Sequence, residues 1–187
     1  MHFPLLTEAF PRTTATKIAA VVLGSLLLTA SAKVQVPFWP VPMTMQTAVV
    51  LILGMAYGWR LGAATVALYL AQGIMGLPVF AGPAAGPAYM AGPTGGYLMG
   101  FLAAATVVGL LAERGWDRSW LRAGAAMALG HAVIFAFGVS WLAVLFGAEK
   151  AIAVGLTPFW AATLLKTALG VVVVKAAWTL ATRGGKA

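Results

Sequence analysis

Long runs of apolar residues, separated by short polar or proline-rich connections, are the dominant pattern of this chain. Each run approaches the roughly 20 residues that a helix needs to cross a bilayer. The six runs cover residues 18–34, 43–59, 61–76, 95–112, 123–146 and 158–180. The pattern predicts an all-α membrane protein with six transmembrane helices, folded as a single integral membrane domain over residues 1–187.

The composition agrees with this prediction and removes other classes of protein. Of the 187 residues, 61% are hydrophobic and 9% are charged, which is more apolar surface than a soluble core of this size can hide. There is no cysteine, so disulfides and thiolate metal sites are excluded. The net charge of +8 is spread between the apolar runs, so it does not indicate nucleic-acid binding.

The distribution of Lys and Arg predicts the orientation, because cytoplasmic loops carry the excess of positive charge. Six crossings would place both termini on one side. That side receives Arg12, Lys17, Arg60, Arg114, Arg118, Arg122, Lys175, Arg183 and Lys186. The other side receives Lys33 and Lys150. We therefore expect cytoplasmic termini, with the connections 34–42, 77–94 and 147–157 facing outward.

Lys166 lies inside the last apolar run, where a charge is unfavourable. A cation near the centre of a spanning helix costs about 2.5–3.5 kcal/mol on insertion scales, so an intramembrane lysine indicates a functional site. If the helix begins near Pro158, Lys166 is about 12 Å from its outer end. Its side chain leans toward that end and shares a face with Thr163 and Phe159. We expect the amine to point into an outward-opening cavity.

Two of the outward connections are unusual. Residues 36–44 hold three prolines among aromatic residues, which stiffens the backbone. This run fits equally well a membrane-surface turn with interfacial aromatic residues or part of a site. Residues 76–96 carry no charge and many glycines, over a length at which loops are usually functional or disordered. We interpret the second connection as a lid over a cavity between helices.

Motifs for catalysis or nucleotide binding are missing from the sequence. No GxxxxGK[ST], GxSxG or HExxH pattern occurs, and none of the four Asp and Glu residues falls within an apolar run. His131 and Ser140 are about 180° apart on one helix, so they cannot form a dyad. For His131 a structural hydrogen bond within the bundle is favoured over a ligand contact. We expect no catalytic residue, no metal and no cofactor.

Small residues recur at a spacing of four, which predicts close packing of helices. The glycines concerned are Gly54, Gly58, Gly62, Gly96 and Gly100. A similar stripe on the first helix comprises Ala15, Ala19, Ala20 and Gly24. This stripe has two interpretations, packing within the bundle and docking of another membrane subunit.

Four features of the chain form a more specific pattern. They are VPMTMQT at 41–47, GLPVFAG at 76–82, GPTGGYLMGF at 92–101 and the lysine of the last helix. Together they closely resemble the BioY family, the biotin-binding S components of energy-coupling factor (ECF) transporters, over about residues 15 to 180. The resemblance implies a six-helix S-component bundle in the bacterial cytoplasmic membrane. It also implies that biotin binds beneath the loops after the first and third helices.

The resemblance further implies partners and contacts. Family members deliver biotin inward with a transmembrane coupling protein and two ATPases. By this resemblance the coupling protein would meet Ala15 and Ala19, together with their neighbours Ala20 and Gly24. Biotin's rings and valeryl chain need an apolar wall, for which the candidates are Phe38, Trp39, Phe80, Tyr89 and Tyr97. Candidates for the ureido group are Thr44, Gln46, Thr94 and Thr163, while Lys166 suits the carboxylate or the ureido oxygen.

One position departs from the family pattern. The family usually has an aspartate one turn before the lysine, where this chain has Thr163. Thr163 can accept one weaker hydrogen bond but leaves Lys166 formally unpaired. Either the carboxylate of the ligand becomes the main counter-charge, or the binding geometry differs, or the affinity is reduced.

Three classes of function stay open at this point. The favoured one is high-affinity biotin uptake by the substrate-specific subunit of an ECF-type transporter. The second is a carrier for another small anionic or ureido-like compound, which the missing aspartate makes plausible. An intramembrane enzyme has the least support, because the apolar runs offer no general acid or base.

Overall fold

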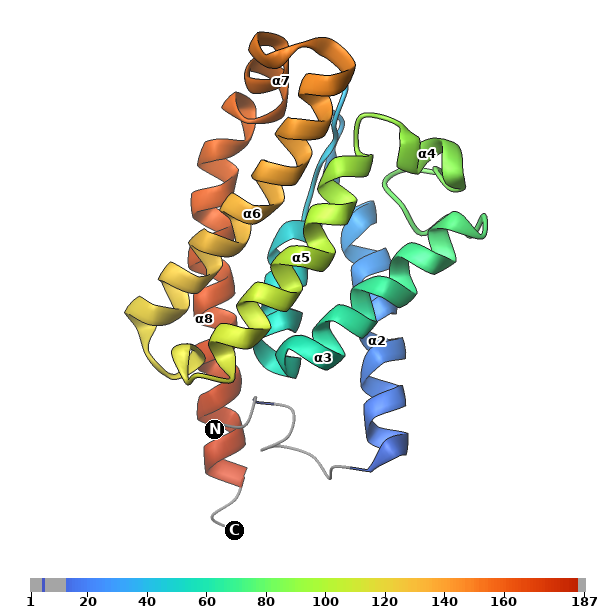
Figure 1. Cartoon of the computed structure of the whole chain (residues 1–187). Helices are drawn as coiled ribbons and strands as arrows, with labels where there is room; N and C mark the ends of the chain where they lie inside the picture. The colour runs from blue at the N-terminus through green and yellow to red at the C-terminus, as the bar shows by residue number, and fades with distance from the viewer. Residues whose placement is uncertain (1–4, 6–12, 185–187) are drawn as a thin grey trace.

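The structure, a computed structural model, describes Leu5 and residues 13–184 (Figure 1). In this part of the chain, 5 helices are long and apolar enough to cross a membrane. The long helices are α2 (Thr14–Lys33), α3 (Gln46–Ile74), α5 (Gly95–Ala112), α6 (Trp120–Phe146) and α8 (Trp160–Gly184). The short elements are β1 (Gln35–Val36), β2 (Met43–Thr44), α4 (Pro87–Ala91), η1 (Trp116–Arg118), α7 (Ala148–Gly155) and η2 (Thr157–Phe159). The predicted all-α class is confirmed.

α3 consists of two helical limbs that meet at Gly58. This residue has φ 75° and ψ 174°, a backbone conformation that glycine adopts readily and residues with a Cβ do not. Figure 1 shows the two limbs diverging from this break. They correspond to the predicted spans 43–59 and 61–76, which explains why six apolar runs become five long helices. The number of membrane crossings stays a prediction.

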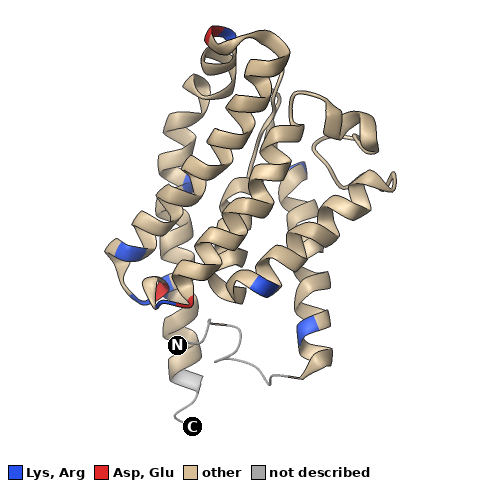
Figure 2. Cartoon of the chain, viewed as in Figure 1, with Lys and Arg blue, Asp and Glu red and all other residues tan. Residues whose placement is uncertain are grey.

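The bundle has two distinct ends (Figure 1). At the terminal end, α2 begins, α8 ends and α3 breaks. The loop end carries the first loop (34–45), the second loop (75–94) and the α7 connection (147–159). Figure 2 shows Lys and Arg gathered mainly toward the terminal end, which is the distribution behind the predicted orientation. Arg12 and Lys186, which also entered that prediction, lie outside the described residues.

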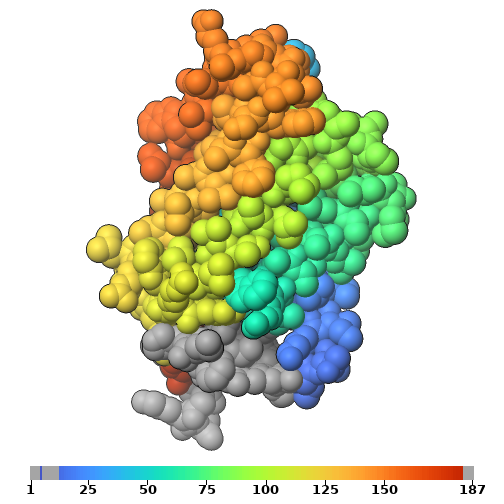
Figure 3. Space-filling view, in the orientation of Figure 1, coloured from blue at the N-terminus to red at the C-terminus, as the bar shows by residue number. Residues whose placement is uncertain are grey.

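The core forms where α3, α5 and α6 approach closely. A Cβ on Gly54 would collide with the backbone of Ala105, and one on Gly100 would press against Ile134. These contacts confirm the predicted packing through small residues. In Figure 3, α5, α6 and the second limb of α3 form an almost continuous surface on the face shown.

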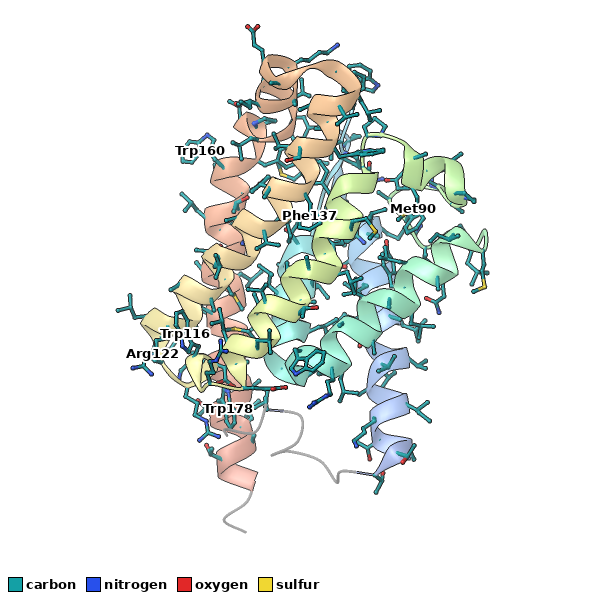
Figure 4. The ribbon with its side chains drawn as sticks, viewed as in Figure 1. Met90, Trp116, Arg122, Phe137, Trp160 and Trp178 are labelled. Carbon is teal, nitrogen blue, oxygen red and sulfur yellow. The ribbon has the colours of Figure 1, made fainter. Side chains whose placement is uncertain are left out.

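A polar cluster joins α8 to η1 at the terminal end. Trp178 Nε1 donates to Oδ2 of the buried Asp117 at 2.9 Å, and Lys175 Nζ donates to the Arg118 carbonyl at 2.6 Å. Figure 4 shows Trp116 and Trp178 at this end of the molecule, whereas Trp160 points outward from the other end of α8. The last helix is therefore fixed at the terminal end of the bundle by contacts that are separate from the Lys166 region.

Candidate ligand-binding site

A small cavity lies inside the bundle near the loop end. Its volume is about 40 Å³. The walls come from the first and second loops, from α3, α5 and α6, and from η2 and α8. The lining residues are Val41, Pro42, Thr44, Gln46, Thr47, Ala81, Thr94, Tyr97, Phe101, His131, Ile134, Phe135, Phe159, Thr163 and Lys166. The cavity is mostly apolar, with one cation and no carboxylate among these residues.

Lys166 is the charged group of this cavity. Its side chain is 8% exposed, and Nζ donates to the carbonyl oxygen of Thr44 at 2.7 Å. An ammonium group has three donor hydrogens, and among the described residues Thr44 supplies its one hydrogen-bond acceptor. Lys166 therefore ties α8 to the end of the first loop and keeps capacity for a further acceptor.

The polar contacts continue from Thr44 across α3 to the second loop. Thr44 Oγ1 donates to Gln46 Oε1 at 3.3 Å, and Gln46 Nε2 donates to the Tyr69 hydroxyl at 2.6 Å. The Tyr69 hydroxyl in turn donates to the Val79 carbonyl at 3.1 Å. Both loops are thus linked to the two limbs of α3 by a continuous chain of hydrogen bonds, which favours one arrangement of the loop end.

Lys33, at the end of α2, holds the second loop by its backbone. Its Nζ donates to the carbonyls of Pro78, Phe80 and Gly82 at 2.7, 2.8 and 2.6 Å. All three donor hydrogens are used, so an exposed lysine fixes the turn that buries the Phe80 ring. In the sequence, Lys33 contributes only a charge to the predicted orientation, so this role was not predicted.

His131 lies on the wall formed by α6. Its side chain is 3% exposed, and Nδ1 lies 3.1 Å from both the Met127 carbonyl and Thr167 Oγ1. The predicted structural hydrogen bond is therefore present. Nε2 is buried and has no hydrogen-bond partner among the described residues.

Six of the predicted contact residues come together in the cavity, and four do not. The six are Lys166, Thr163, Thr44, Gln46, Thr94 and Tyr97. Phe38 and Trp39 are 43% and 75% exposed, and Trp39 lies beside Phe146. Phe80 is fully buried against Tyr69 and stacks on Tyr89, behind the cavity wall. The proposed apolar wall is instead supplied largely by residues that sequence reasoning left out.

The missed lining residues lie on helices as well as in the two loops. They include Phe101, Ile134 and Phe135, whose apolar side chains look in the sequence like any other residues of a membrane helix. Phe159 was placed on the face of Lys166 by helical spacing, and the structure brings it into the same cavity. The same spacing could have found Phe101, four residues after Tyr97, and Phe135, four residues after His131.

The small-residue stripe of α2 divides between two environments. Ala15 and Ala19 are exposed, whereas Ala20 and Gly24 are buried. A Cβ on Gly24 would collide with Thr65, so this position serves packing within the bundle.

An apolar groove of about 630 Å³ adjoins the stripe at the terminal end. It is lined by Leu5, Thr16, Ala19, Ala20, Leu23, Ala56, Tyr57, Ala177, Leu180 and Ala181.

The fold and the cavity together define a class: a helical membrane protein that encloses a small, mostly apolar site with one buried cation near its loop end. A family model places the chain more narrowly. The BioY family model matches residues 7–183, and the chain belongs to the BioY family.

Individual relatives agree with this assignment. The biotin transporter BioY of Thermotoga maritima is 38% identical over 148 residues, covering 79% of this chain and 86% of the relative. The probable biotin transporter BioY of Pyrococcus horikoshii is 34% identical over 161 residues, covering 86% and 95%.

A solved structure confirms the predicted S-component-like fold. It is the S-component for biotin from an ECF-type ABC transporter, which superimposes with a TM-score of 0.77 over 89% of this chain and 94% of its own. Its sequence identity is 22%, so this likeness bears on the fold alone.

Proposed function

We propose that this chain binds biotin at the Lys166 cavity and carries it across the bacterial cytoplasmic membrane as the substrate-binding subunit of an ECF-type transporter. Membership of the BioY family, whose named relatives are biotin transporters, supports this proposal. Because the family consists of transporters, the prediction that the chain is not an enzyme is confirmed.

The observation that carries the proposal is the buried ammonium of Lys166. Among the described residues it has one acceptor, the Thr44 carbonyl, and none of those that line the cavity is a carboxylate. A buried cation without a counter-charge is costly, so an anionic or strongly polar ligand gains by meeting it. Biotin offers both a carboxylate and a ureido oxygen, and its rings and valeryl chain suit the apolar walls.

The size of the cavity indicates how the ligand enters. Pockets for small molecules usually measure about 300–1,000 Å³, whereas this cavity measures about 40 Å³. The walls must therefore separate when biotin binds. The Lys166 to Thr44 hydrogen bond holds the first loop against α8. Lys166 Nζ has further donor hydrogens, so a ligand oxygen can bind it beside the Thr44 carbonyl or in its place, and in the second case the first loop is released as the ligand arrives.

Transport requires an energy source, which the partners would supply. We propose that a transmembrane coupling protein docks on the apolar groove at the terminal end, where Ala15 and Ala19 are exposed. Two ATPase subunits attached to it would hydrolyse ATP, since the sequence has no nucleotide-binding loop. Membrane lipid would cover the rest of the apolar surface.

Thr163 favours a second candidate, a carrier for another small anionic or ureido-like compound. It lines the cavity in the position where the family usually has a carboxylate, so the cavity is more positive than the family pattern predicts. A ligand with a stronger negative charge than biotin would benefit most from this difference.

Isothermal titration of the purified, detergent-solubilised chain tests the proposal. The ligands are biotin, biotin methyl ester and lipoate, which shares the carboxylate-bearing chain but lacks the ureido ring. Saturable binding of biotin with much weaker binding of lipoate is expected. Equal binding of both acids would favour the second candidate, and no binding of biotin would overturn the proposal. Loss of binding with the methyl ester would assign Lys166 to the carboxylate rather than to the ureido oxygen.

A further inference from the structure

The two ring nitrogens of His131 lie on different edges of the imidazole, and only one of these edges makes hydrogen bonds to the described residues. The engaged edge, Nδ1, contacts the Met127 carbonyl of its own helix and Thr167 Oγ1 of α8. The free edge, Nε2, is buried without a hydrogen-bond partner among the described residues. Since buried polar atoms nearly always have partners, the free nitrogen requires an explanation.

The engaged edge determines the chemistry of the free edge. A carbonyl oxygen only accepts hydrogen bonds, so the contact with Met127 places the hydrogen on Nδ1. A second positive charge in the apolar cavity that already holds Lys166 would be costly, which favours the neutral ring. In a neutral imidazole with hydrogen on Nδ1, Nε2 is an acceptor.

The surroundings hold this acceptor in place at the cavity. His131 is one of the lining residues. The preceding residue, Gly130, lies against Leu51 and Val108, where a Cβ would collide with both side chains. The helix and the ring are thus fixed from two directions, by close packing and by the bonds of Nδ1. A fixed acceptor suits recognition of a specific donor, because little freedom is lost on binding.

Two other polar side chains of the cavity, Gln46 and Lys166, are less suited to this task, and a threonine hydroxyl such as that of Thr163 accepts more weakly. Gln46 already uses Oε1 for Thr44 and Nε2 for Tyr69. Lys166 only donates. A ligand with N–H groups therefore finds an uncommitted acceptor of the required type at His131 Nε2.

We propose that His131 is a ligand-contacting residue whose Nε2 accepts a hydrogen bond from a ureido N–H of the bound ligand. This assignment rests on the proposed function and adds a specificity determinant to it. Lys166 selects ligands with an acceptor or an anionic group, and His131 selects those that also present an N–H donor. The bond from Nδ1 to Met127 positions the ring for this contact.

Two substitutions separate ligand contact from a purely structural role. His131→Asn keeps a donor near the Nδ1 position, where it can reach Met127, but removes the Nε2 atom. His131→Gln places an amide group near the Nε2 position. We expect His131→Asn to weaken biotin binding by about tenfold and His131→Gln by about threefold or less. Both variants should melt close to wild type without ligand. Unchanged affinity of His131→Asn, or equal losses in both variants, would overturn the assignment.

Modified ligands give a readout that does not depend on the folding of a variant. Biotin methylated on one ureido nitrogen lacks the N–H at that position. The wild type should bind one of the two monomethyl isomers at least about tenfold more weakly than biotin, and in His131→Asn this difference should shrink. If the wild type binds both isomers as tightly as biotin, the His131 assignment is overturned, but the proposed function is not. A wild-type protein that binds no biotin would overturn the proposed function and this assignment together.

Discussion

The two loops that cover the cavity are held in different ways. The second loop (75–94) is fixed to three helices. Lys33 of α2 holds three of its carbonyls, Tyr69 of α3 donates to Val79, and Trp141 Nε1 of α6 donates to the Gly92 carbonyl at 2.9 Å. The first loop (34–45) bonds chiefly to itself, through the antiparallel pairing of β1 with β2.

The difference indicates which loop moves. The first loop exposes Phe38 and Trp39, and its hydrogen bond to α8 comes from Lys166, the side chain that we propose as a ligand contact. The second loop buries Phe80 completely. Segments with few buried contacts open at low free energy, whereas well-packed segments stay closed. We therefore expect the first loop to move more readily than the second, which would make the second loop a fixed wall rather than the lid that the sequence suggested.

A matched pair of substitutions, one in each loop, should show the largest difference in stability between the two loops. Phe80→Ala removes a fully buried ring that packs against Tyr69 and Tyr89, so the free energy of unfolding should fall by about 3–5 kcal/mol. Phe38→Ala removes a ring that is 43% exposed, and the fall should stay below about 1 kcal/mol. Thermal or denaturant unfolding in detergent measures both. Equal losses would show that the two loops are anchored alike.

Lys33→Met should loosen the second loop alone. Methionine keeps an apolar stem but removes the three hydrogen bonds to the backbone. Because Lys33 is exposed, we expect a local loss of about 1 kcal/mol. Hydrogen exchange followed by mass spectrometry should show faster exchange in 76–86 and no change in 34–45. Lys17→Met, at an exposed position on the same helix, is the control. Faster exchange in the first loop as well would contradict the separation of the two loops.

Trp141→Phe should have the smallest effect. It removes one hydrogen bond, from Nε1 to the Gly92 carbonyl, and keeps an aromatic ring. A loss of about 0.5 kcal/mol, the low end for one hydrogen bond, is expected, confined to the junction of α4 and α5. Hydrogen exchange at residues 92–95 measures it. A change that spreads to the first loop would mean that the loop end responds as one unit.

The helices could be predicted from the sequence because apolar length is a direct signal of a membrane helix. The range 95–112 coincides with α5. Lys166 was also predictable, because a charge in an apolar run stands out against its neighbours. The break in α3 was predicted close to Arg60, where the apolar run is interrupted, whereas the structure places it at Gly58. The chain reverses where glycine permits a positive φ, near the charge but not at it.

The loop aromatic residues were harder to predict, because their surroundings are set by tertiary contacts. Phe80 and Tyr89 were expected to face the ligand, yet they pack behind the wall, where the absence of a side chain at Gly73 leaves room for the Phe80 ring. Lys33 gave no signal beyond its charge, since its partners are backbone carbonyls that no sequence pattern marks. Helical periodicity indicates which residues share a face but not what lies opposite that face.

A comparison of the two lysines at the loop end tests the central claim most directly. Lys166 and Lys33 both donate to backbone carbonyls, but only Lys166 lines the cavity. Isothermal titration with biotin should show that Lys166→Met loses about 100-fold or more in affinity, while Lys33→Met stays within about tenfold of wild type. Wild-type affinity in a folded Lys166→Met protein would contradict the account, because the buried ammonium would then have no part in holding the ligand.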